Sequence, residues 1–286
     1  MYVKPATPLT VGGVLDDAIK LYRASFRPCL IIALIGAIAM LAASMWMMVQ
    51  AVGLSASILS ATRGGGTPDL QTLLPQMLGT FGQMTKSYVV VGLVSLIVFA
   101  AVFAQTSQIH RGEAPLGVGD AFVKALRRLP GLILGSFIFT AAVWIGLFLL
   151  FIPGVYLWGK LEFWFAAIFA DDTGAIDGLG RSWNATVGNW WRSVTVISIA
   201  IIMIVVLLIM VYLVFGALVG MPLLFTHPTG LDWRLALPML LGGLLRVIML
   251  PMYAAVMLST YHDMKLRREG ADLASRAQAL PSAQGA

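Results

Sequence analysis

Three charged residues, Lys160, Glu162 and Arg246, stand inside apolar runs of the sequence and are the first candidates for chemistry. A charge inside a membrane-spanning helix costs at least about 2.5 kcal/mol, so such residues usually pair or face a polar cavity. Glu162 and Arg246 lie near the middle of their apolar runs, which favours an ion pair between them. Lys160 is about 200° around a helix from Glu162, so the two side chains do not face one partner.

This trio allows two interpretations. In the functional one, Lys160, Glu162 and Arg246 form the floor of a polar cavity for a lipid headgroup or an ion. In the structural one, Glu162 and Arg246 lock two helices together while Lys160 extends its ammonium to the membrane surface. The residue types and spacing alone fit both.

The remaining polar residues do not form a known catalytic or metal-binding pattern. The Asp-Thr-Gly triplet at residues 172–174 copies that of aspartic proteases, but those enzymes need two such aspartates, and the sequence has no second triplet. His110, His227 and His262 fall in different loops, which argues against a zinc cluster. Phosphate-binding glycine loops and nucleophile elbows are absent from the sequence. We therefore expect no catalytic residue, no metal and no cofactor.

Composition places the chain in a membrane. Of its 286 residues, 59% are apolar and only 11% are charged, and the mean hydropathy is +0.88. A soluble domain carries about 25% charged residues, so this chain cannot cover a surface of the usual kind in water. Cys29 is the single cysteine, which excludes a disulfide-built secreted module. The net charge of +6 has no matching set of base-stacking aromatic residues on a soluble surface, so we expect no nucleic-acid partner.

Six apolar segments reach or approach the length of about 20 residues that a helix needs to cross a bilayer. The expected spans are residues 29–54, 87–104, 131–152, 155–170, 194–219 and 235–260. Pro153 and Gly154 separate the third span from the fourth, which predicts a tight helical hairpin. The sequence thus predicts an all-α integral membrane domain over residues 1–273, followed by a disordered cytoplasmic tail over residues 274–286.

The distribution of Lys and Arg predicts the orientation. Fourteen of the 19 basic residues stand before the first span, after the last, or in the loops between the second and third and the fourth and fifth spans. Cytoplasmic loops carry this excess, so both termini are predicted in the cytoplasm of a bacterium, with the spans in its inner membrane. The same charges would attract anionic lipid headgroups.

The segments before the first, third and fifth spans resemble one another. Each is amphipathic at helical spacing and has an acidic residue four positions before a basic one, which predicts interfacial helices. The residues are Asp16, Lys20 and Arg23, then Asp120, Lys124 and Arg127, then Asp177 and Arg181. An interfacial helix followed by two spans would therefore occur three times. Acid–base pairs at this spacing are also common on any helix surface, so a chance likeness is the alternative.

Three blocks of the sequence resemble a known family. They read GGVLDDAIKLYRASF from Gly12, IPGVYLWGKLEFWFAAIFADDTGAIDGLGRSWNATVGNWWR from Ile152, and YHDMKLRREGADL from Tyr261. This resembles the six-span bacterial membrane family called the glycerophosphoryl diester phosphodiesterase membrane domain, with its uncharacterised YciC-like relatives. The positions that carry the resemblance are Pro153, Gly154, Lys160, Leu161, Phe163, Gly174, Arg181, Ser182, Gly188, Trp191, Arg192, Tyr261, Asp263, Arg267, Glu269, Gly270, Asp272 and Leu273.

The resemblance implies a six-span membrane fold and little about activity. Gly178 and Gly180 depart from the family pattern, which has Ala and a basic residue there. The family takes its name from members that also carry a soluble phosphodiesterase barrel of about 250 residues. This chain has no room for that barrel, so the resemblance implies no phosphodiesterase activity.

Three classes of function follow from these observations. The leading hypothesis is a non-enzymatic polytopic membrane protein that organises a protein partner, further copies of itself or the cell envelope through the repeated helices. The alternative is a transporter or lipid-handling protein with a cavity around Lys160, Glu162 and Arg246. An intramembrane enzyme is the third, and the sequence shows no nucleophile with a base beside it. A large wet cavity would favour the alternative, whereas a closed apolar bundle with an exposed groove would favour the leading hypothesis.

Overall fold

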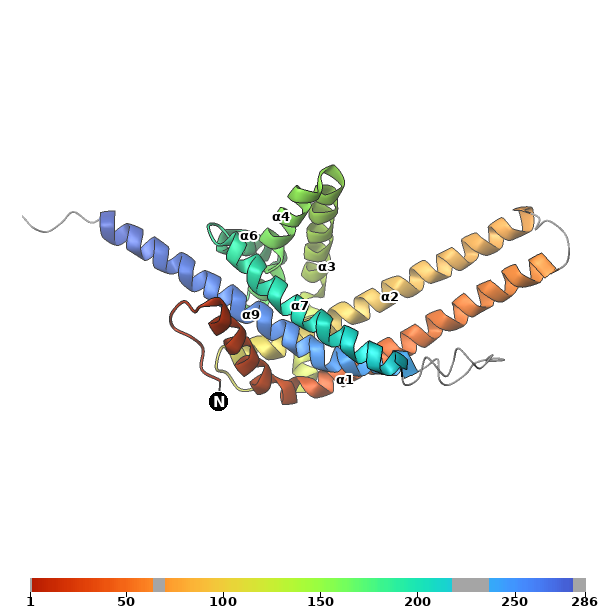
Figure 1. The fold of residues 1–286 in the computed structure, drawn as a ribbon, viewed down its shortest axis with the longest axis horizontal. Helices are drawn as coiled ribbons and strands as arrows, with labels where there is room; N and C mark the ends of the chain where they lie inside the picture. Colours follow the sequence, from red (N-terminus) through yellow and green to blue (C-terminus); the bar gives the residue numbers. More distant parts are fainter. Residues whose placement is uncertain (1, 64–69, 218–236, 280–286) are drawn as a thin grey trace, which may run out of the picture.

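The computed structural model describes the backbone of residues 2–63, 70–217 and 237–279, and this part of the chain is helical without strands (Figure 1). The helices are α1 (Val11–Arg63), α2 (Leu70–His110), α3 (Val118–Leu149), α4 (Phe151–Leu161), α5 (Trp164–Asp171), α6 (Ala175–Ala185), α7 (Trp190–Phe215) and α9 (Leu237–Ala279). Five segments are long and apolar enough to cross a membrane, namely Val11–Val49, Met77–His110, Val118–Leu149, Trp190–Phe215 and Leu240–Gly270. The all-α, multi-pass membrane class predicted from composition is confirmed.

The predicted fourth span is not one helix. Residues 155–170 fall on α4 and α5, which have 11 and 8 residues and are separated by Glu162 and Phe163. The hairpin before them also differs from the prediction, because α3 ends at Leu149 and Leu150 makes the turn. Pro153 instead lies in the first turn of α4, where the backbone N–H that proline lacks would have no helical partner.

The segments predicted as interfacial helices take two forms. The first is continuous with the long helix α1 through Pro28, and the second with α3 through Pro130. Only the third, α6, is a separate amphipathic helix. The structure therefore does not reproduce a threefold repeat of equal units. At the chain end, α9 continues to Ala279 and so includes part of the predicted disordered tail. Two predicted span ends, at residues 219 and 235, and the loop histidine at position 227 lie outside the described residues.

The core lies where the short helix α5 is surrounded by the long ones. The side chains from Trp164 to Phe169 are all buried. They pack against α6, the second half of α9 and the end of α2, and they share one apolar cluster with fully buried residues such as Phe103, Leu258 and Leu21. A helix segment that is apolar on every side is buried on every side, which is why these six residues occupy the centre.

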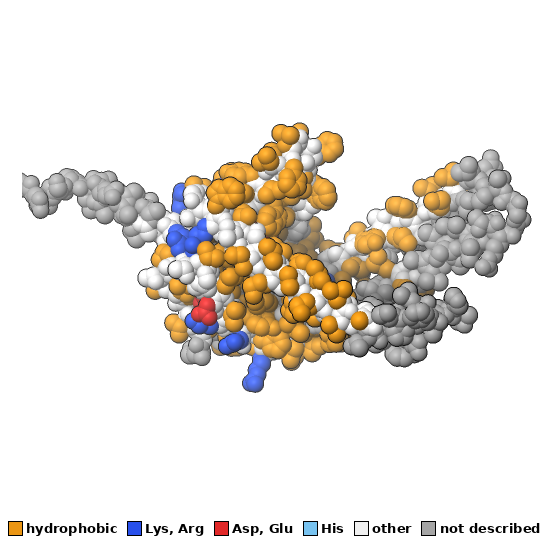
Figure 2. Space-filling view, in the orientation of Figure 1, with side chains coloured by type: hydrophobic (Ala, Val, Ile, Leu, Met, Phe, Trp, Pro, Cys, Tyr) orange, Lys and Arg blue, Asp and Glu red, His pale blue; other side chains and the backbone are white. Residues whose placement is uncertain are grey.

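Arms extend from this core. Figure 1 shows α1 and α2 running together to one side and the α3–α4 hairpin projecting in another direction. Their outer surfaces are apolar and exposed, including Phe148 at 92% exposure and Phe81 at 72%. Figure 2 shows apolar side chains over the visible parts of the arms, whereas the visible Lys and Arg side chains lie on the left and lower side of the body, away from the arms. Apolar surface of this extent is what a membrane-embedded chain presents to lipid.

The segment from α4 to α5 runs back along α3 over the whole length of the hairpin. Near the turn, a Cβ atom on Gly146 would lie 2.9 Å from the Cα of Gly154, so the helices are in backbone contact. Farther along, Gly135 lies against the ring of Trp164. At the far end, Arg128 of α3 pairs with Asp172, directly after α5. The broken segment therefore covers the same depth as the second part of α3.

Candidate ligand-binding site at the broken helix

A serine from a neighbouring helix forms hydrogen bonds with the backbone at the break between α4 and α5. The hydroxyl of Ser182 on α6 donates to the carbonyl of Lys160 at 2.8 Å and accepts from the backbone N–H of Phe163 at 3.1 Å. Ser182 is fully buried. An N–H or carbonyl group that a helix break leaves unpaired inside a membrane destabilises the fold by several kcal/mol. The Ser182 side chain pairs both groups and so stabilises the break. Residue-type reasoning does not assign this role, although Ser182 is one of the positions that carry the family resemblance.

Glu162 lies in the break, and its partners are neutral. Its carboxylate accepts a hydrogen bond from the hydroxyl of Tyr253 on α9 at 2.5 Å, and the neutral side chain of Trp158 lies beside it. Arg246 forms no ion pair with it, so the predicted pair between Glu162 and Arg246 is wrong. Among the residues that the structure describes, no Lys or Arg forms a salt bridge with this carboxylate.

A cavity of about 200 Å³ opens beside this carboxylate, between α2, α3, α5 and α9. Glu162 is the charged residue of its lining, and the Ser136 and Thr140 hydroxyls of α3 add polar groups. The other walls are largely aromatic: Phe99, Phe103, Phe139, Trp164, Phe165 and Tyr253. The Phe99 ring lies 4.7 Å from the Phe165 ring and 5.7 Å from the Tyr253 ring, which makes a nearly continuous aromatic wall.

Lys160 points away from the cavity, as its angular separation from Glu162 predicts. It is only 4% exposed, and its ammonium lies 5.6 Å from the ring centre of Tyr156 and 5.3 Å from that of Trp183. Cations are attracted to ring faces at these distances. Lys160 therefore has aromatic partners within the protein, and the extension of its ammonium to the membrane surface stays a prediction. The structure thus separates the three charged residues of the predicted site.

Asp171, the last residue of α5, joins three elements. It accepts hydrogen bonds from Tyr261 at 2.8 Å, from Lys265 at 2.8 Å and from Arg181 at 2.9 Å. Burial raises the pKa of Asp171, but the hydrogen bonds from Lys265 and Tyr261 lower it more, so the pKa lies below its ordinary value. Arg128 and Arg111 also donate to the last carbonyls of α5, where cations stabilise a helix C-terminus.

Of the three predicted acid–base pairs on the interfacial helices, one forms a salt bridge in the structure. Asp16 and Lys20 form an exposed salt bridge at 2.6 Å. Arg181 pairs with Asp171 rather than with Asp177. Asp120 and Lys124 show no salt bridge in the structure, nor do Arg23 and Arg127, all of which lie in the described part of the chain.

A second network fixes the first residues of the chain. Asp263 of α9 accepts from Arg192 at 3.1 Å, from Arg267 at 3.0 Å and from the backbone N–H of Leu9 at 2.7 Å. Both arginines also donate to the carbonyl of Leu9 at 2.5 Å. Three of these residues carry the family resemblance, but sequence reasoning gave them no role. Segments that were all predicted on the cytoplasmic side thus meet at one end of the molecule.

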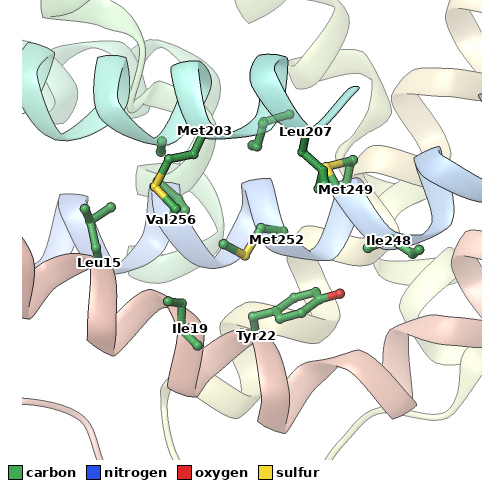
Figure 3. Close-up of a pocket in the computed structure, with 11 residues that line it drawn as sticks. Leu15, Ile19, Tyr22, Met203, Leu207, Ile248, Met249, Met252 and Val256 are labelled. Carbon is green, nitrogen blue, oxygen red and sulfur yellow. The ribbon is translucent and has the colours of Figure 1, made fainter. Parts of the chain in front are cut away.

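A separate apolar groove of about 250 Å³ lies between α1, α7 and α9. Figure 3 shows side chains of all three helices around it, among them Leu15, Met203, Leu207, Met249 and Met252. Apart from the hydroxyl of Tyr22, these side chains offer no hydrogen-bonding group. The groove therefore differs in chemistry from the cavity at Glu162.

The fold and the cavity define a class: a multi-pass helical membrane protein with a broken helix and a carboxylate beside a cavity within the helical bundle. No family model, no curated protein and no solved structure matches the chain. The family resemblance noted in the sequence therefore stays a prediction.

Proposed function

We propose that the chain is a non-enzymatic membrane protein of six crossings that takes a lipid or another amphipathic ligand from the bilayer into the cavity at the α4–α5 break. The observation that carries this proposal is the Glu162 carboxylate, which lines the cavity and, among the described residues, accepts from the neutral Tyr253 hydroxyl and from no cation. A carboxylate in this setting is expensive and usually functional. Helices broken at a polar site are also typical of transporters, which bind their ligands there.

The sixth crossing in this proposal is α4 and α5 together. They run antiparallel to α3 from the contact of Gly146 with Gly154 to the pair of Arg128 with Asp172. At 1.5 Å per residue, the part of α3 from Arg128 to its end spans about 33 Å, close to the thickness of a hydrocarbon core. Six crossings place both termini on one side, and the basic end of the molecule fits the cytoplasmic side of a bacterial inner membrane.

A second candidate is the organisation of a protein partner, favoured by the groove in Figure 3. Methionine-lined apolar grooves accept helices of varied sequence. A lipid chain fills such a groove equally well, so the groove does not distinguish the two functions. Binding of a partner helix in the groove would leave the Glu162 carboxylate at the other cavity unexplained. The ligand-binding proposal therefore accounts for more of the structure.

The test of ligand binding uses a pair of neighbouring residues on α3. Ser136 lines the cavity, whereas Phe137 is 72% exposed on the outer surface. We expect Ser136→Trp to fill the cavity and to abolish the lipid that the purified protein retains, as measured by native mass spectrometry. Phe137→Trp is the control and should retain the lipid of the unsubstituted protein. Equal retention by both variants, or no retained ligand in the unsubstituted protein, would refute the proposal.

A further inference from the structure

The walls of the cavity at Glu162 have the chemistry of a cation site. Ring faces carry partial negative charge, and aromatic cages with a nearby carboxylate are used to recognise organic ammonium groups. Six aromatic side chains line this cavity, and Glu162 contributes the formal charge. Resting on the proposed function, we infer that the ligand carries an organic ammonium group, which forms an ion pair with Glu162 within the aromatic wall.

The chain already places one ammonium of its own against aromatic rings. Lys160 stands two residues before Glu162, and its ammonium lies over the rings of Tyr156 and Trp183. The same broken helix thus places one internal cation among aromatic rings on one side and an unpaired carboxylate among aromatic rings on the other. The second site has the complementary charge for an external cation.

Other ligand classes fit the cavity less well. A phosphate or carboxylate ligand would be repelled by the negative charge of Glu162, and the lining has no Lys or Arg to offset that repulsion. A divalent metal needs several oxygen ligands, and within the described residues no group of three or more His, Cys, Asp or Glu could hold one. An acyl chain would leave the carboxylate with its Tyr253 hydrogen bond but without a cationic partner in an apolar space, which is costly.

The size of the cavity limits what enters it. Its volume of about 200 Å³ corresponds to roughly seven water molecules at 30 Å³ each. An ethanolamine or trimethylammonium group fits this space, but a whole phospholipid does not. The ammonium therefore belongs either to the headgroup of a lipid whose remainder lies outside the cavity or to a small free amine.

The test compares ligands that differ by their charge. Native mass spectrometry of the full chain measures retention of an ethanolamine-headgroup phospholipid against a glycerol-headgroup phospholipid with the same acyl chains. Titration calorimetry then measures the binding of free ethanolamine against ethylene glycol. We expect the protein to prefer the ammonium member of at least one pair by about tenfold or more, as for other charge-assisted contacts. This comparison needs no variant, so a folding defect cannot obscure it.

Substitutions then locate the site. Glu162→Gln should remove the preference for the ammonium ligand, and Phe99→Leu should weaken it, since both residues line the cavity. Asp16→Asn is the control, because it neutralises an exposed carboxylate on α1 and should leave the preference unchanged.

Each outcome decides a different question. Preference for the ethanolamine lipid supports the inference with a lipid as the source, and binding of ethanolamine alone supports it with a free amine as the source. Equal retention of both lipids, with no binding of ethanolamine, would overturn the inference and leave the proposed function standing. Loss of all retention, with neither lipid nor amine bound, would overturn both.

Discussion

Replacing Ser182 by alanine should destabilise the protein through the backbone of a different segment. The substitution removes a fully buried hydroxyl that serves the carbonyl of Lys160 and the N–H of Phe163. An unsatisfied buried polar group costs about 1 to 3 kcal/mol, so the loss of both bonds should lower the free energy of unfolding by roughly 2 to 6 kcal/mol. Because the break orients Glu162, ligand retention should fall as well.

The assay is reversible unfolding of the purified protein in mixed micelles, followed by circular dichroism. Ser193→Ala is the matched control, because Ser193 is equally buried but donates only to the carbonyl of Trp190, in the first turn of its own helix. That change should cost less than about 1 kcal/mol. Equal destabilisation by the two variants would refute the reasoning, because the loss could then be assigned to any buried serine.

Three further predictions follow. Asp171→Asn should lower the free energy of unfolding by roughly 1 to 3 kcal/mol at pH 7, since the lost hydrogen bonds are charged but the Arg181 and Lys265 partners are partly exposed. Since the pKa of Asp171 is lowered by folding, its contribution is present at neutral pH and lost as pH falls below about 4, so the melting temperature of the variant should decline less in acid than that of the unsubstituted protein. Gly154→Ala should cost about 1 to 3 kcal/mol in chemical denaturation, because its Cβ would clash with the helix α3, whereas Gly180→Ala meets open space and should stabilise α6 slightly. Asp263→Asn should raise the hydrogen-exchange rate of the Leu9 amide at least about tenfold, because that amide donates to the Asp263 carboxylate, and an unchanged rate would contradict this assignment.

The sequence predicts where the long apolar helices lie, because a bilayer requires about 20 apolar residues in a row, but α1, α2 and α9 extend well beyond the predicted spans. It does not predict the break after Leu161, because the residues from Leu161 to Trp164 include neither proline nor glycine. Pro28 and Pro130, which are helix breakers by type, lie inside continuous helices. The break depends instead on Ser182, a tertiary contact from a helix farther along the chain. Local propensity does not contain that information.

The partner of Glu162 shows which part of the site was predictable. The rarity of charge in apolar segments identifies Glu162 itself. Matching residues by depth selected Arg246, whereas the structure places Tyr253 against the carboxylate. Tyr253 follows Arg246 by seven residues, so it lies on the same face of α9 but about 10 Å farther along the axis. The helix face was therefore correct and the depth was wrong by two turns, because the packing of α5 sets that depth.

The carboxylates of this chain differ in how far the fold satisfies them. Asp171 and Asp263 each accept from three donors, of which two are cationic, and both tie separate elements together. Glu162 accepts from Tyr253, which is neutral, and it faces a cavity rather than another helix. A carboxylate that only stabilised the bundle would gain from a cationic partner, as the other two do. An unpaired charge that is held by a neutral donor beside a cavity is suited to a partner that arrives from outside.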